Sequence, residues 1–153
     1  MTTAANKFMW TTNIPVSKTI AELSSTLVAA GARHISQTYG ESGHITGLSF
    51  MLHVDGLPVY FKLPARTERL FERINGQRKR QQTQHAEDDR RQAEKIAWRQ
   101  LLRWTEAQCA LCETGMVQAH EVFLPYAQDR TGKTLFENLQ AGKFKALSAP
   151  EGK

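Results

Sequence analysis

Cysteine and long apolar runs are both scarce in this sequence. The 153 residues include only two cysteines, too few for a small secreted protein held together by disulfides. The longest strictly apolar runs, such as residues 27–30, are far shorter than the roughly 18 residues that a membrane-spanning helix needs. The first ten residues carry one lysine and no apolar stretch of signal-peptide length. We therefore expect a soluble, cytoplasmic protein.

The composition that is present is typical of one globular domain. Hydrophobic residues make up 41% of the chain, which argues against a disordered protein. A chain of this length buries roughly 70% of its extended surface on folding, enough for a core of its own. Lys and Arg total 20 against 15 Asp and Glu, so the formal net charge is +5.

An extended arm and one helix are expected at the N-terminus. Pro15 disfavours a helical conformation in the residue before it, so residues 1–16 are interpreted as an extended arm. Ser17 is a favourable N-cap residue, and apolar residues recur at helical spacing from there to Gly31. The pattern predicts a helix over residues 18–30.

Residues 34–63 have the two-residue period of β-strands. Apolar and polar side chains alternate from Ile45 to Val54 and again over residues 59–63. Between these two segments, Asp55-Gly56 is a strong hairpin signal. Together with a weaker alternation over residues 34–39, the pattern predicts a three-stranded antiparallel meander with one packed face.

Helices are expected to dominate the C-terminal half. Residues 66–76 are predicted to form a short helix and residues 87–113 a long one, with acidic residues at its start. Thr134 begins a capping-box pattern before a last short helix. The predicted fold class is α+β: a helix, a three-stranded antiparallel meander, and a helical half built on one long central helix. Residues 17–142 would form a single domain, followed by a flexible tail, residues 143–153.

The long helix is apolar on two sides. At 100° per residue, Ala97 and Trp104 fall on one broad face, whereas Trp98, Leu102 and Cys109 fall on roughly the opposite side. Such a helix packs between two layers or offers its second stripe to another chain. We expect it to lie across the packed face of the sheet. The C-terminal segment would cover the rest, or a second subunit in a homodimer through Trp98 and Leu102.

Basic residues concentrate in the middle of the chain. Residues 62–103 hold twelve basic side chains, mostly Arg, and six acidic ones, so the positive charge is local. Arg is suited to bidentate phosphate recognition, and such a cluster indicates binding to nucleic acid or to an acidic protein surface. The candidate contact residues are Arg66, Arg69, Arg73, Arg78, Lys79, Arg80, Arg91, Lys95, Arg99 and Arg103.

A solvated helix face with local ion pairs explains the same charges. Glu87 and Arg91, for example, are separated by one helical turn. No base-reading motif accompanies the cluster: the sequence lacks an RNP aromatic signature, a zinc finger and a GXXG loop. The order helix, three strands, helix is shared with double-stranded-RNA-binding domains, but the lysine cluster of those domains is absent as a motif. Both interpretations stay open.

Three further patterns give weaker indications. Residues 127–134 match a loose phosphate-loop pattern, but a turn followed by a capping box explains the same letters. The two cysteines form a CxxC pattern inside a helix, where buried thiols are the simpler interpretation. His34, His53 and Tyr60 can face the open side of the sheet, which leaves a small-molecule site there as an alternative. We predict no catalytic residue, no metal and no cofactor.

Distinctive short segments are spread over residues 11–138. They include Thr11-Thr12-Asn13-Ile14-Pro15, Phe61-Lys62-Leu63-Pro64-Ala65, Trp104-Thr105-Glu106-Ala107-Gln108, Glu121-Val122-Phe123-Leu124-Pro125-Tyr126 and Gly132-Lys133-Thr134-Leu135. In combination these segments resemble a family of small bacteriophage and prophage proteins. The resemblance implies a protein of a mobile element that acts in the cytoplasm of the host cell. It implies no activity, ligand or catalytic residue.

The cluster of basic residues and the resemblance to phage proteins together predict a non-enzymatic nucleic-acid-binding accessory protein of a phage or other mobile element. This protein would act through a basic, Arg-rich helical surface. The alternative is an anti-defence protein, for example a CRISPR inhibitor, that binds a host protein or nucleoprotein complex. A small-molecule binder on the exposed sheet face is the third possibility. DNA and RNA are not distinguished at this stage, and neither is the oligomeric state.

Overall fold

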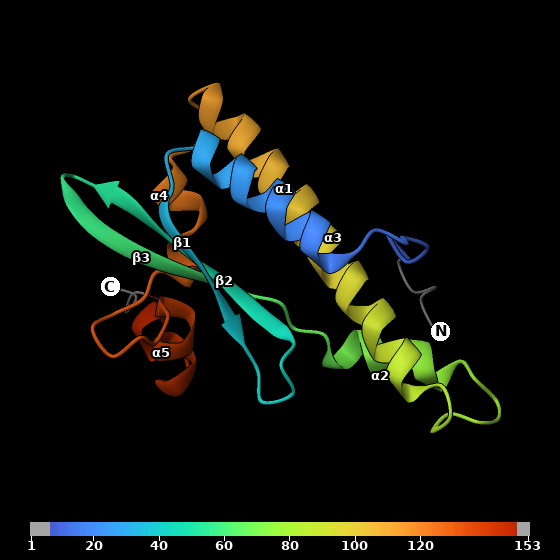
Figure 1. Ribbon diagram of the computed structural model, residues 1–153. Coiled ribbons are helices and arrows are strands. Elements are labelled where there is room, and N and C mark those ends of the chain that lie inside the picture. Colours follow the sequence, from blue (N-terminus) through green and yellow to red (C-terminus); the bar gives the residue numbers. More distant parts are fainter. Residues whose placement is uncertain (1–6, 150–153) are drawn as a thin grey trace.

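The computed structural model describes residues 7–149, and within them the α+β fold expected from the sequence is present (Figure 1). The elements in chain order are α1 Val16–Ala29, β1 Arg33–Tyr39, β2 Ile45–Val54, β3 Leu57–Pro64, α2 Glu68–Gly76, α3 Ala86–Glu113, α4 Ala119–Val122, the short 3-10 helix η1 Leu124–Tyr126, α5 Leu135–Ala141 and the short 3-10 helix η2 Lys145–Leu147. No helix within residues 7–149 has the length and apolar character needed to cross a membrane.

The sheet is the predicted meander. Its three strands are antiparallel in the order β1-β2-β3, and Asp55 and Gly56 close the β2–β3 hairpin with backbone φ angles of 51° and 80°. These left-handed conformations suit Gly and are tolerated by Asp, which is why this dipeptide signals a tight hairpin. The register places Phe50 opposite Phe61, and both rings are buried on the packed face.

Helices α1 and α3 lie side by side against that face (Figure 1). Trp98 and Leu102 of α3 are 0% and 1% exposed, and they belong to one core cluster with Leu23 of α1 and Phe50 of β2. The second apolar stripe of α3 is therefore covered by α1 and the sheet of the same chain. The dimer expected through Trp98 and Leu102 has no exposed surface at these two residues, so that expectation is corrected.

The N-terminal segment is attached to α3. The Gln92 side chain donates hydrogen bonds to the backbone carbonyl oxygens of Trp10 and Thr12, at 3.0 and 2.9 Å. Gln100 donates to the carbonyl oxygen of Phe8 at 2.9 Å. Residues 8–11 form a turn rather than the fully extended arm that was predicted, and residues 1–6 lie outside the described residues.

The start of α1 differs from the prediction. The helix begins at Val16, with Pro15 in the N-cap position and no side-chain cap. Proline is pre-organised for the start of a helix because its φ angle is fixed and its missing N–H is not needed there. Ser17 is consequently inside the first turn and does not cap it.

The chain after α4 extends the sheet at its β3 edge. Ala127 forms an isolated bridge with Phe61, and the backbone N–H of Gln128 donates to the carbonyl oxygen of Tyr60 at 2.8 Å. This pairing holds Tyr126, the last residue of η1, close to β3. The predicted cap of α5 is confirmed, since the Thr134 hydroxyl accepts a hydrogen bond from the backbone N–H of Glu137 at 3.1 Å.

Candidate nucleic-acid interface

Arg99, one of the predicted phosphate contacts, is buried inside the domain. Its side chain is 5% exposed and donates to a Glu22 carboxylate oxygen of α1 at 2.9 Å and to the Thr19 hydroxyl at 3.3 Å. A guanidinium in this position joins α3 to α1 and cannot reach a nucleic acid. The prediction for Arg99 is therefore wrong, because α1 packs over this part of α3.

Arg78 also makes an ion pair inside the domain. Its guanidinium makes two hydrogen bonds, at 2.9 and 2.8 Å, to the carboxylate of Asp89, whose side chain is 3% exposed. Asn75 donates a third hydrogen bond to the same carboxylate at 3.0 Å. The cluster fixes the loop between α2 and α3 to the first turns of α3. Arg78 thus has a structural partner where a phosphate contact was predicted.

The Asp89 cluster predicts a pH-dependent contribution to stability. The hydrogen bonds from Arg78 hold the pKa of the Asp89 carboxyl below its ordinary value. A depressed folded-state pKa stabilises the fold above the ordinary pKa, and this stability is lost as the pH falls through the folded-state value. We expect Asp89→Asn to lower the free energy of unfolding at neutral pH by about 1–2 kcal/mol, and the difference to shrink below the ordinary carboxyl pKa.

Urea unfolding at a series of pH values measures this difference. Asp88→Asn, at the exposed neighbouring position, is the matched control and should change stability by only a few tenths of a kcal/mol. A destabilisation by Asp89→Asn that stayed constant down to the most acidic pH would contradict the assignment.

Two more candidates form exposed ion pairs. Arg91 lies 3.5 Å from the Glu87 carboxylate, and Arg103 lies 3.0 Å from that of Glu106. The local pairing expected for a solvated helix face is therefore present at Arg91. Exposed pairs of this kind contribute little and exchange readily, so Arg91 and Arg103 keep the ability to meet an anion.

The remaining candidates fall into one cluster and one outlier. The outlier is Lys95, which is half-buried on α3. The helical rotation of about 100° per residue puts it roughly 200° around the helix from Ala97, which lines a cavity together with Leu70 of α2. Lys95 therefore lies on the side of α3 away from α2. Five exposed cations share α2, its N-terminal flank and the following loop, and among residues 7–149 none of the five has a carboxylate partner. We name this cluster the α2 patch: Arg66, Arg69, Arg73, Lys79 and Arg80.

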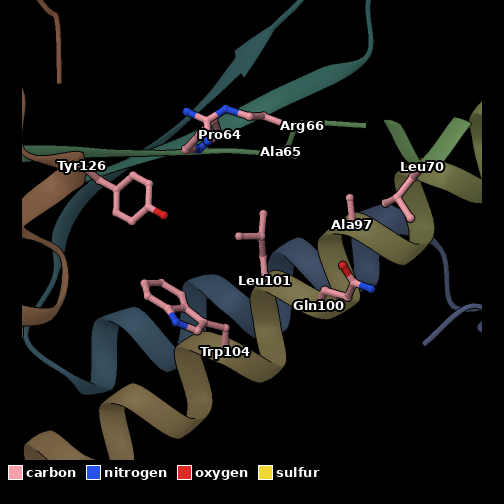
Figure 2. Close-up of a pocket in the computed structure, with 9 residues that line it drawn as sticks. All are labelled: Pro64, Ala65, Arg66, Leu70, Ala97, Gln100, Leu101, Trp104 and Tyr126. Atoms are coloured by element: carbon pink, nitrogen blue, oxygen red, sulfur yellow. The ribbon is translucent and has the colours of Figure 1, made fainter. Parts of the chain in front are cut away.

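The arginines at α2 and the acidic residue Glu68 lie on different sides of this helix. Positions 66, 69 and 73 follow the helical repeat, as does Leu70, and Arg66 and Leu70 both line the cavity drawn in Figure 2. Glu68 lies on the other side of α2, where it lines a different cavity together with His44 and Glu94. Arg66 therefore borders the groove, Arg69 and Arg73 lie farther along the exposed surface of α2, and Glu68 faces the other cavity.

The groove beside the arginines contains a cavity of about 330 Å³ between α3 and the segment that joins β3 to α2 (Figure 2). Its walls are mostly apolar, with three polar side chains. The lining residues are Pro64, Ala65, Arg66, Leu70, Ala97, Gln100, Leu101, Trp104 and Tyr126.

The sequence pattern does not indicate this cavity. Trp104 was assigned to a packing face of the long helix, and Tyr126 was assigned no role. The pairing of residues 127–128 with the β3 edge brings the two rings to a centroid distance of 6.1 Å. Nothing in the local pattern around Tyr126 indicates that contact, because it depends on an isolated bridge.

The other candidate chemistries find little support. His34, His53 and Tyr60 are exposed, and they do not line the cavities described here, including the one in Figure 2. The Nδ1 atom of His44 instead lies 3.0 Å from a Glu94 carboxylate oxygen, a contact that ties the β1–β2 loop to α3. Among the residues that the structure describes, no group of three or more His, Cys, Asp or Glu is placed to hold a metal ion.

The cysteines are free thiols. Burial raises the pKa of Cys109 to about 11 and also raises the pKa of Cys112. A thiol with a raised pKa has little thiolate at neutral pH, so these residues lack the activation that redox or nucleophilic chemistry needs.

Residues 127–134, which match the loose phosphate-loop pattern, form a turn. Gln128 pairs with Thr134, and the Asp129 carboxylate accepts hydrogen bonds from the backbone N–H groups of Thr131 and Lys133. Hydrogen bonds from Thr131 and from the Asn138 side chain lower the pKa of Asp129 to about 2. The Asp129 carboxylate therefore uses the backbone N–H groups of Thr131 and Lys133 for the turn itself.

Comparison with known proteins assigns no family to this chain. No protein-family model matches it, and neither curated proteins nor solved structures give a match. The resemblance to phage and prophage proteins therefore stays a prediction.

Proposed function

We propose that this protein is a non-enzymatic nucleic-acid-binding protein that acts through the α2 patch, as an accessory factor of a phage or other mobile element. One observation carries the proposal. Five exposed cations gather on α2 and its flanking segments, and none of them is neutralised by a carboxylate among residues 7–149. Helix α2 and the loop lie at the end of the molecule opposite the β2–β3 hairpin (Figure 1).

One ion pair and one cation–π contact outside the patch support this role by holding its segments in place. Arg78 and Asp89 fix the loop that carries Lys79 and Arg80, and Arg90 stacks on the Phe71 ring at 4.0 Å, which holds α2 against α3. A pre-ordered set of cations loses less entropy on binding than a flexible one. Binding would be sequence-tolerant, because contacts to phosphates carry no base information.

Fluorescence anisotropy with labelled single-stranded and double-stranded oligonucleotides tests the proposal. Each neutralised phosphate of a single strand contributes about −0.7 to the slope of log affinity against log salt concentration, so five contacts give a slope of about −3.5. The absence of binding to every oligonucleotide at about 50 mM salt would end the proposal. Capture of a host protein from nuclease-treated lysate, without oligonucleotide binding, would favour the anti-defence alternative.

A further inference from the structure

We propose that the cavity in Figure 2 receives one unstacked nucleobase, so that the α2 patch selects single-stranded over double-stranded nucleic acid. This inference rests on the proposed function, because the cavity holds the base while the arginines hold the backbone. It also specifies the partner, which contact with phosphates alone does not.

The lining of the cavity is mostly apolar and includes two aromatic rings. The rings of Trp104 and Tyr126 stand nearly perpendicular, at 76°, and line it together with Leu70 and Leu101. Its volume of about 330 Å³ is at the small end of the range for ligand cavities. An unstacked base packs well on aromatic rings, and this contact is independent of base identity because every base has a π face.

Polar groups are available for the edge of the base. The Gln100 side-chain nitrogen donates to the Phe8 carbonyl oxygen, which leaves the amide oxygen of Gln100 as an acceptor. Figure 2 shows the Tyr126 hydroxyl directed into the cavity. An acceptor and a hydroxyl therefore face the space where the base edge would lie.

Cations flank the cavity at both ends. Arg66 lines its rim and stacks near the Phe136 ring at 5.7 Å, and Arg69 and Arg73 continue from it along α2. Beyond Gln100 and Trp104, a second hollow is lined by Phe8 and Arg103. A backbone that crosses the groove thus meets positive charge before and after the cavity. In a duplex the bases stay stacked and cannot enter.

The decisive experiment compares two single strands with equal numbers of phosphates. One is oligothymidylate of about twelve nucleotides, and the other is an abasic strand of the same length. We expect the full-length protein to bind oligothymidylate about ten-fold more tightly, since stacking of one base contributes on this scale. Equal affinities for the two strands would overturn the base-binding role and leave phosphate binding intact. Failure of both strands and of a duplex of the same length to bind would instead refute the proposed function.

A cavity-filling variant locates the base. Ala97→Leu extends a side chain into the space, and we expect its affinity for oligothymidylate to fall to that for the abasic strand. If this variant does not fold, as judged by circular dichroism, quenching of Trp104 fluorescence in the wild-type protein gives the same information. Quenching by oligothymidylate, absent in Trp104→Phe and with the abasic strand, supports the inference. Quenching of equal size by both strands contradicts it.

Discussion

Charge reversal of Arg69 and Arg73 to Glu is expected to weaken binding of single-stranded oligonucleotides by about 25-fold or more at about 100 mM salt. Each lost phosphate contact accounts for a factor of about five at this concentration, on the basis of a salt slope near 0.7 per contact. The introduced carboxylates add repulsion to this loss. Both side chains are exposed and have no ion-pair partner within residues 7–149, so folding should be unaffected.

Reversal of Arg130 and Lys133 to Glu is the matched control. These two cations are also exposed, and the double variant changes the net charge by the same amount, but it lies in the turn before α5. We expect its affinity to fall by less than about three-fold, because only long-range attraction is lost at this salt concentration. Equal losses in the two double variants would show that net charge rather than the α2 patch drives binding.

Removal of the Glu22 carboxylate is expected to cause the largest loss of stability among the ion-pair variants. Among residues 7–149, Glu22→Ala leaves the buried Arg99 guanidinium with only the Thr19 hydroxyl as a side-chain partner, and an uncompensated buried charge is costly. Glu22 itself is 39% exposed, so water can approach the vacated position. We therefore expect a loss of about 2–3 kcal/mol in the free energy of unfolding, below the upper values for fully buried pairs.

Replacement of both Glu22 and Arg99 distinguishes the cost of an unpaired buried charge from a simple loss of side-chain packing. The double variant Glu22→Leu with Arg99→Met removes the charge along with its partner and should recover most of the stability. Urea unfolding monitored by circular dichroism measures both variants. Glu106→Ala, which breaks the exposed pair with Arg103, should cost less than about 0.5 kcal/mol. A double variant as unstable as Glu22→Ala would contradict the buried-charge explanation.

The secondary structure was predictable because its signals are local. The alternation in β2 and β3, the Asp55-Gly56 turn and the Thr134 cap are each written in a few consecutive residues, and all are confirmed. The start of α1 was misplaced because Pro15 and Ser17 both favour a helix start. The sequence does not state which of the two acts as the boundary.

The roles of the cations were only partly predictable. Arg91, Lys95 and Arg99 follow one another at intervals of four residues, which puts them along one row of α3. Spacing does not reveal that α1 packs against part of this row, which buries Arg99 and pairs it with a carboxylate 77 residues away. The Arg78–Asp89 contact similarly depends on how the loop folds back. Identification of the α2 patch required knowing which cations already have partners.

The attachment of the N-terminal segment to α3 has a consequence for how this part of the chain can diverge. Two glutamines recognise main-chain oxygens, which every amino acid supplies. Thr11, between two of these anchor points, and Asn13, just after the last one, are exposed, and substitutions there leave the anchoring hydrogen bonds in place. The segment can therefore acquire new surface chemistry beside the groove while its course along the helix is preserved.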